Sequence, residues 1–175
     1  AVAMDMNTAY DLEVRAHCPN AEVVFDLFHV VAKYGREVID RVRVDEANRL
    51  RDDRPARRVV KTSRWLLLRN RENVPVDQAV KLDELLAANR ALLTVYLLKD
   101  DLKRLWRYRS EAWARKFWKG WKRRALRSGL EPLKPFVRRL EPYLPAILAH
   151  CRRPLGHNLV EGIYTKIKGF RPVSL

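Results

Sequence analysis

The spacing of apolar residues changes once along this chain, near residue 27, and that change constrains the fold more than any other feature. Before it lie two short apolar runs, AVAMDM at residues 1–6 and EVVFD at residues 22–26. Short apolar runs bounded by turn residues are typical of buried strands. Beyond residue 27, apolar residues recur every three or four positions, as in amphipathic helices. We therefore expect two strands near the start and helices through most of the remaining chain.

The first 26 residues predict a strand–helix–strand unit. Residues 9–18 have helical character, Asn7 or Thr8 supplies an N-cap, and Pro19 begins a turn. Two strands joined by a crossover helix favour a parallel pair in an α/β sheet. Because two strands alone do not make a stable sheet, we expect earlier strands of a longer protein to complete it.

The helical part is expected to contain several helices. Apolar residues at helical spacing predict helices over residues 30–42 and 77–102, the second being either one long helix or a pair. Another helix begins at Ser110 and Glu111 and ends at Gly129.

The sequence also predicts the connections between these helices. A charged run with Pro55, residues 48–61, predicts a loop or linker. Glu-Pro pairs at 131–132 and 141–142 each predict a helix start, since proline is tolerated in the first helical turn. A last helix is expected at about 158–168. The middle of the chain is therefore predicted to be all α.

Positive charge is concentrated in the middle of the chain. Residues 45–154 hold 28 basic and 13 acidic side chains, a net charge of +15, whereas residues 1–44 carry −2 and residues 155–175 carry +2. Arginine supplies 25 of the 36 basic residues, which suits bidentate contacts to phosphate. A field of this size attracts polyanions. We expect nucleic acid as the partner, with an anionic membrane surface as the competing interpretation.

One basic segment is also rich in aromatic residues. Between residues 102 and 127, eleven basic residues and one acidic residue are interleaved with six aromatic residues. Three aromatic residues at four-residue steps predict an apolar helix face that packs in the core, and they are Trp113, Phe117 and Trp121. Base stacking on these rings is the less favoured alternative. The side chains expected to follow a DNA backbone are Arg115, Lys119 and Lys122.

The two cysteines, Cys18 and Cys151, cannot form a disulfide framework and fit a reducing compartment. Each follows a histidine directly, without the spacing of structural zinc ligands, so no zinc site is expected. No apolar run approaches the ~18 residues that a membrane span requires.

Two carboxylates lie in apolar surroundings, Asp5 after the first strand-like run and Glu161 in the last predicted helix. Acidic residues are seldom buried without a partner. Each of the two, taken alone, is better explained as a surface or helix-capping charge than as a functional acid. In a strongly basic protein they favour a divalent-metal site for phosphoryl transfer.

Several motifs together make the chain resemble the C-terminal part of DDE-type bacterial insertion-sequence transposases of the ISL3 group. They are VVFDLFHV, SRWLLLRN, the LLxxN…YLLK helix, the Trp-rich segment, SGLEPLKPF and NLVEGIYTKIKGF. The resemblance covers nearly the whole chain, in order. It implies an α/β fragment that is predominantly α, with a partial ribonuclease-H-like core (two short parallel strands plus helices) and a large all-α insertion. The implied parts are core residues 1–44, the basic insertion 45–154 and a C-terminal core helix in 155–175.

The resemblance also implies catalytic residues. Asp5 matches the second catalytic carboxylate and Glu161 the third, and together they would bind two Mg²⁺ ions, with Mn²⁺ as the alternative. The first carboxylate would lie on an earlier strand outside this chain, so we expect the chain alone to be inactive. Asp26 and His29 match an Asp-x-x-His motif, with a role near the catalytic strand or the cleaved DNA. A structural role, in which His29 caps the sheet and holds Asp26 by a hydrogen bond, is equally favoured.

Four further residues are carried over as DNA-binding candidates. Lys166 and Lys168 would place positive charge beyond Glu161, where the DNA backbone approaches. Arg64 and Trp65 lie in SRWLLLRN, which we interpret first as packing of the insertion and second as a DNA contact.

The resemblance implies that the complete protein cuts and joins phosphodiesters during DNA transposition. It implies transposon-end DNA as partner, a homo-oligomer, a location in the bacterial cytoplasm and no membrane association. A different class of function stays open, a non-enzymatic helical DNA-binding module in which residues 45–154 carry the affinity. A helical protein on anionic membrane is the third interpretation.

Overall fold

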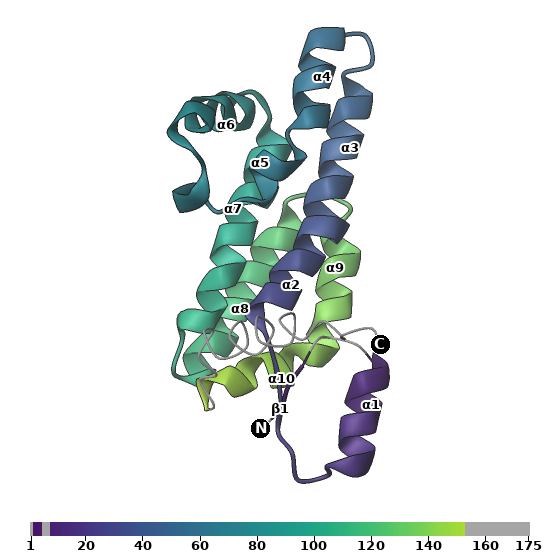
Figure 1. The fold of residues 1–175 in the computed structure, drawn as a ribbon, viewed down its shortest axis with the longest axis vertical. Coiled ribbons are helices and arrows are strands. Elements are labelled where there is room, and N and C mark those ends of the chain that lie inside the picture. Colours follow the sequence, from purple (N-terminus) through teal and green to yellow (C-terminus); the bar gives the residue numbers. More distant parts are fainter. Residues whose placement is uncertain (1, 5–7, 153–175) are drawn as a thin grey trace, which may run out of the picture.

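The computed structural model describes residues 2–4 and 8–152, with side chains from residue 12 onward except that of residue 15 (Figure 1). Two short strands, β1 (Val2–Met4) and β2 (Val23–Phe25), pair in parallel. Helix α1 (Thr8–His17) connects them. All three residues of β2 are buried, as expected for an apolar run of this length.

Helices make up most of the described chain. Residues 27–49 form one continuous helical rod, in which α2 (Leu27–Tyr34) passes through a π-helical turn (Gly35–Ile39) into α3 (Asp40–Arg49). A Cβ atom on Gly35 would lie 2.7 Å from Cδ2 of Leu68, so glycine allows a neighbouring helix to approach this turn closely. The later helices are α4 (Arg54–Thr62), α5 (Arg64–Leu68), α6 (Val76–Ala88), α7 (Arg90–Arg104), α8 (Glu111–Arg127), α9 (Leu133–Leu140) and α10 (Leu144–Leu148).

Side-chain caps explain where several helices begin. The Asp53 carboxylate accepts a hydrogen bond from the amide of Ala56 at 3.0 Å, and Pro55 lies in the first turn of α4. The expectation of a loop or linker over residues 48–61 is therefore wrong, because this cap starts a helix after a short turn. Asn89 likewise caps α7 through the amide of Leu92, at 2.9 Å, and so separates α6 from α7.

The core lies between the helical rod and helices α7, α8 and α9. The hydroxyl of Tyr34 donates to the carbonyl of Val95 at 2.9 Å, and the indole N–H of Trp121 donates to the carbonyl of Leu98 at 2.9 Å. Phe136 packs edge-on against Tyr34, with ring centroids 5.1 Å apart. Most of the leucines predicted to be buried on α6 and α7 are buried. Leu97 is an exception and is exposed.

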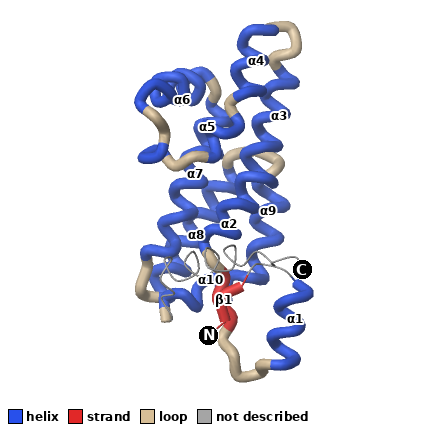
Figure 2. Tube along the Cα trace, viewed as in Figure 1, coloured by secondary structure: helices blue, strands red, loops and turns tan. Residues whose placement is uncertain are grey.

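We call the helices of residues 27–148 the helical lobe. The strands lie at one end of this lobe, and the arms formed by α4 and α6 lie at the other (Figure 2). Helix α10 and the turn at Ala149–Cys151 contact β2, so the chain returns to the strands after the helical lobe. The predicted boundary between residues 44 and 45 falls inside α3, and it stays a prediction. No described helix is both long enough and apolar enough to span a membrane.

Candidate nucleic-acid interface

The carboxyl ends of β1 and β2 are aligned. Met4 pairs with Phe25, so the next residues along the two strands are Asp5 and Asp26. The side chain of Asp26 caps α2, accepting from the amide of Phe28 at 3.1 Å. The placement of Asp5 itself lies outside the described residues.

His29 lies one helical turn after Asp26 and is half-buried. Its ring contacts that of Phe28 edge-on, with centroids 5.5 Å apart. Both His29 and Asp26 have further interactions in the structure. The catalytic and the structural roles of this pair both stay predictions.

The remaining predicted catalytic and C-terminal residues, Glu161, Lys166 and Lys168, lie outside the described residues. Within residues 12–152, no group of three or more His, Cys, Asp or Glu side chains is arranged to hold a metal ion. Asp26 is the only predicted acid whose side chain is described there, and it is engaged at a helix start.

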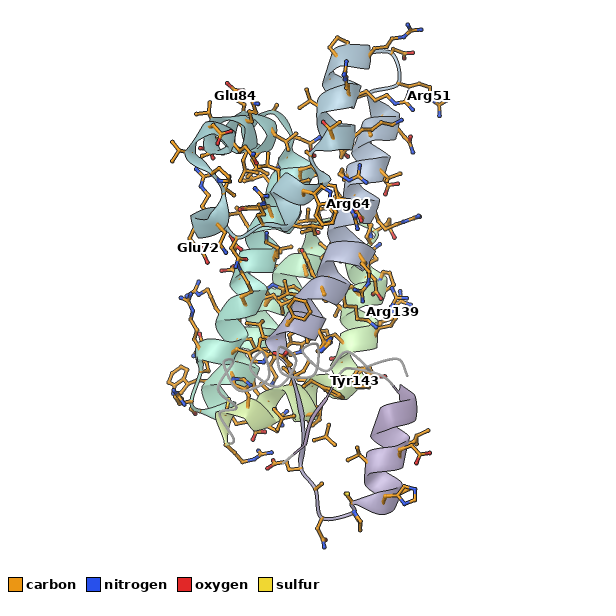
Figure 3. The ribbon with its side chains drawn as sticks, viewed as in Figure 1. Arg51, Arg64, Glu72, Glu84, Arg139 and Tyr143 are labelled. Atoms are coloured by element: carbon orange, nitrogen blue, oxygen red, sulfur yellow. The ribbon has the colours of Figure 1, made fainter. Side chains whose placement is uncertain are left out.

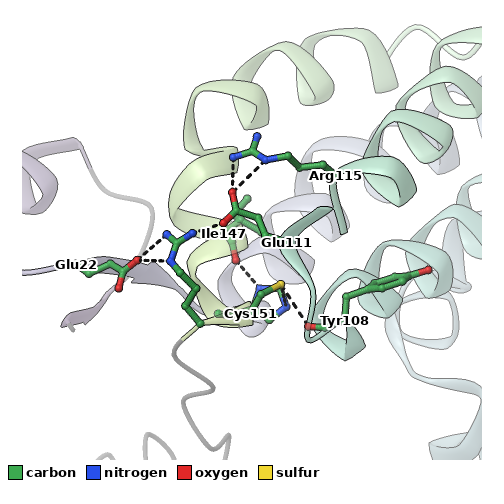
Figure 4. Close-up of polar contacts among 8 residues, drawn as sticks. Glu22, Tyr108, Glu111, Arg115, Ile147 and Cys151 are labelled. Carbon is green, nitrogen blue, oxygen red and sulfur yellow. Dashed lines mark hydrogen bonds and ion pairs between the residues drawn. The ribbon is translucent and has the colours of Figure 1, made fainter. Parts of the chain in front are cut away.

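An ion-pair network joins the end of the helical lobe to the strands (Figure 4). The Arg152 guanidinium donates to one Glu22 oxygen from Nε at 3.0 Å and from a terminal nitrogen at 2.6 Å. Its other terminal nitrogen pairs with Glu111, in the first turn of α8. Glu111 also accepts from Arg115 at 2.5 Å. Arg152 therefore connects the residue preceding β2 to the start of α8.

The adjacent residues His150 and Cys151 pack beneath this network. His150 is buried, stacks on Trp106 with centroids 5.8 Å apart, and its Nδ1 lies 2.5 Å from the Ile147 carbonyl. The Cys151 thiol donates to the Tyr108 carbonyl at 3.3 Å. Burial raises the pKa of the Cys151 thiol. A lowered pKa favours a reactive thiol, so the raised pKa of Cys151 disfavours such a role for this residue.

Helix α8 has one apolar face in the core and one basic face toward solvent. Its buried residues are Ala114, Trp118, Trp121 and Ala125. The predicted aromatic row is therefore only partly correct, because Trp113 is 59% exposed and Phe117 is half-buried. The exposed cations on α8 are Arg115, Lys116, Lys119, Arg123, Arg124 and Arg127.

A shallow groove of about 430 Å³ runs along this basic face, and we call it the α8 groove. Its cations are Arg104, Lys116, Arg123 and Arg124, and its aromatic residues are Tyr108, Trp113, Phe117 and Trp121. The Lys116 ammonium lies 5.0 Å from the centre of the Trp113 ring, and the Arg104 guanidinium lies 5.7 Å from that of Phe117. Gly120 also lines the groove, and a Cβ atom there would meet nothing within 4 Å. Cations beside exposed rings are the combination that binds phosphates and bases.

The predicted DNA-binding residues on α8 differ in their availability. Arg115 pairs with Glu111, and Lys122 donates to Glu141 at 2.5 Å. Lys119 is exposed. Reasoning from the sequence missed the four groove cations. The sequence feature that could have indicated the groove is Gly120, because a glycine inside a helix leaves a hollow between the neighbouring side chains.

Arg64 and Trp65 lie away from the α8 groove. Nε of Arg64 donates to Asp40 at 2.7 Å, and the guanidinium lies 4.8 Å from the centre of the Trp65 ring. Trp65 is 67% exposed and lines a second cleft, between α4 and α6. Packing of the insertion and contact to DNA both stay predictions for this segment.

Comparison with known proteins identifies the chain's relatives. Residues 1–174 match a family model described as transposase, of the DDE type and ISL3 group. The chain is 64% identical over 168 residues to the transposase for insertion sequence element IS1001 of Bordetella parapertussis. That match covers 96% of this chain and 41% of the relative, so the chain spans about two fifths of the relative's length. No solved structure matches the chain.

Proposed function

We propose that the chain forms part of an enzyme that cuts and joins DNA strands during transposition. The basis is its family, because the chain belongs to the ISL3 family of DDE transposases. In this proposal, residues 45–154 bind DNA, and residues on either side of them contribute to the catalytic site. Because the chain spans about two fifths of its relative, the activity is proposed for the complete transposase and not for this chain alone.

The α8 groove carries the DNA-binding part of the proposal. Its four cations come from α7 and α8, and two of them, Lys116 and Arg123, form no ion pair with another described residue. Arg124 pairs with Asp101 at 2.9 Å, and Arg104 pairs with the same aspartate at 3.1 Å. Unpaired cations contribute the most free energy to phosphate binding, because no ion pair within the protein must be broken first. Binding at such a surface releases counterions and depends steeply on salt.

The ends of the two strands support the catalytic part. Ligands of open α/β sheets bind at the carboxyl ends of parallel strands, and Asp5 directly follows β1 at this edge. The chain returns to β2 through Ala149–Cys151, and Arg152 is paired with Glu22. Glu161 follows nine residues after this attachment. We propose that Asp5 and Glu161 act together at this edge, with Asp26 and His29 nearby.

Carboxylate oxygens are the ligands that Mg²⁺ prefers, so the donor chemistry of the proposed pair suits this ion. When bound, the metal would activate the attacking oxygen and stabilise the leaving oxygen. Within the protein, Asp26 would fix the start of α2 beside the site, and Lys166 and Lys168 would attract the DNA backbone.

DNA binding by the 175-residue chain tests the first part of the proposal. We expect the affinity for duplex DNA to fall linearly with salt on logarithmic axes, and to be the same with Mg²⁺ and with EDTA. Binding to anionic vesicles without binding to DNA would contradict the proposal. The catalytic part needs the complete transposase, in which Asp5→Asn is expected to abolish strand transfer. If the chain binds DNA without metal and the complete transposase carrying Asp5→Asn still transfers strands normally, this chain would be a DNA-binding module without a catalytic role.

A further inference from the structure

The α8 groove has more exposed aromatic surface than contacts to phosphate require. Trp113, which lines the groove, is 59% exposed. The half-buried rings of Tyr108 and Phe117 also line it, with their centroids 5.3 Å apart. Contacts to a DNA backbone use charged groups and hydrogen-bond donors, which the carbon faces of these rings do not provide. The rings therefore suit a second part of a ligand, one that is flat and apolar.

Four residues of the groove share one face of α8, because they are three or four positions apart. They are Trp113, Lys116, Gly120 and Arg123. Gly120 has no side chain, and a Cβ atom there would meet nothing within 4 Å. The helix surface is therefore open between Trp113 and Arg123. A flat group that enters at Gly120 has an aromatic residue before it on the helix and a cation after it.

Contacts between α7 and α8, which lie side by side (Figure 1), hold the groove in shape. Trp121 is buried, and its indole N–H donates to the carbonyl of Leu98 on α7. Arg104 of α7 and Arg124 of α8 both pair with Asp101. A surface that is fixed in this way loses little conformational entropy when a ligand binds.

The ligand that suits this groove carries negative charge and flat rings together. Every charged side chain in the described lining is a cation. A nucleic-acid strand supplies a phosphate and a base at each nucleotide. In a duplex, each base is stacked inside the helix and cannot lie on a protein ring. In an unpaired strand the faces of the bases are accessible, and they stack on aromatic side chains whatever the base sequence.

We propose that the α8 groove holds an unpaired DNA strand, with a base stacked on Trp113 and the neighbouring phosphates bound by Lys116 and Arg123. This inference rests on the proposed function, since it names the form of DNA that the same site takes. The proposed reaction supplies such a strand, because the end of a cut strand can separate from its complement. The four cations keep a role in binding duplex DNA, whereas the Trp113 ring acts only where a base is unpaired.

Binding of two single strands to the 175-residue chain tests the inference. One strand consists of thymidines, and the other has the same length and phosphates but stable abasic sites in place of the bases. We expect the thymidine strand to bind about tenfold more tightly. Trp113→Leu should remove this preference, while the matched control Trp113→Phe, which keeps a ring, should retain most of it. Neither variant removes a charge, so the salt slope measured by fluorescence anisotropy should stay the same.

The two substitutions, of the bases and of the ring, also form a double-mutant cycle. Their effects on affinity should not add, because both remove the same contact. Additive effects, equal binding of the two strands by the wild-type chain, or an unchanged preference in Trp113→Leu would each overturn the inference. Duplex binding tests the proposed function separately. A chain that binds duplex DNA with a steep salt dependence, but binds the two single strands equally, would overturn the inference alone, whereas a chain that binds no DNA would overturn both.

Discussion

Arg152 and Glu22 are separated by 130 positions in the chain, yet the Arg152 guanidinium donates two hydrogen bonds to one Glu22 carboxylate oxygen. The same guanidinium pairs with Glu111 at the start of α8. Glu22 directly precedes β2. This arrangement connects the strands, the basic helix and the segment that continues toward Glu161.

Replacing Arg152 with alanine should reduce strand transfer much more than it reduces the stability of the fold. The side chain is about half exposed, so we expect the free energy of unfolding to fall only slightly, as for other exposed ion pairs. Strand transfer by the complete transposase should fall much further, because the segment leading to Glu161 loses its attachment to β2. Arg51→Ala, which removes an exposed arginine in the turn between α3 and α4, is the control and should leave strand transfer unchanged. Equal strand transfer by the two variants would mean that Arg152 does not position the segment leading to Glu161.

The α8 groove should account for much of the DNA affinity. We expect Lys116→Glu combined with Arg123→Glu to weaken duplex binding and to lower the salt slope by about 0.9 for each DNA phosphate that the variant no longer neutralises. Arg51→Glu combined with Arg54→Glu is the matched control with the same change in net charge. Arg51, in the turn between α3 and α4 (Figure 3), and Arg54, at the start of α4, are exposed and do not line the groove. Fluorescence anisotropy at several salt concentrations measures both quantities. An equal reduction in the control would mean that net charge, and not the groove, determines binding.

Filling the hollow at Gly120 should separate helix stability from binding. A Cβ atom there meets no neighbour, so Gly120→Ala should raise the free energy of unfolding by about 0.5–1 kcal/mol and leave DNA affinity unchanged. Gly120→Phe should instead weaken DNA binding, because its ring would occupy the groove. Thermal unfolding and anisotropy check the two variants. Full affinity in the phenylalanine variant would place the DNA elsewhere.

Lys99 should make stability depend on pH. Burial lowers the pKa of Lys99 from 10.5 to about 8, while Asp100 opposes this shift. Between about pH 8 and 10.5 the unfolded chain therefore binds more protons than the folded chain, so the free energy of unfolding should rise with pH. Urea unfolding should show a smaller rise for Lys99→Met, whereas the exposed control Lys81→Met should keep it. The same rise in both variants would exclude Lys99 as its source.

Local patterns predicted much of the fold. The short apolar runs ending at Met4 and Phe25 and the helical spacing beyond residue 27 indicated the strands and most helices, because both depend on residues close in sequence. The high charge of residues 48–61 hides the helix at 54–62, whose start depends on the cap at Asp53 and the proline in its first turn. In the structure, Arg54, Arg58 and Lys61 of α4 are exposed while Val60 is buried.

The proposed binding surface was harder to predict, because several of its cations are paired, in part with residues of other elements. Lys122 is paired with Glu141, nineteen residues later, while Arg115 is paired with Glu111, one turn earlier. The sequence indicated a basic, aromatic helix correctly. It did not indicate which cations remain available, nor that Trp113 faces solvent while Trp118 is buried. These details depend on how α7 and α9 pack against α8.

The most direct measurement of the central claim is strand transfer by the complete transposase carrying Asp5→Asn or Glu161→Gln, measured together with DNA binding. Our account predicts that each variant abolishes cleavage and joining at every Mg²⁺ or Mn²⁺ concentration while DNA affinity is kept. Asp77→Asn, at the far end of the helical lobe, serves as the control and should transfer strands normally. Normal strand transfer by either catalytic variant would contradict the claim that these two acids act at one site.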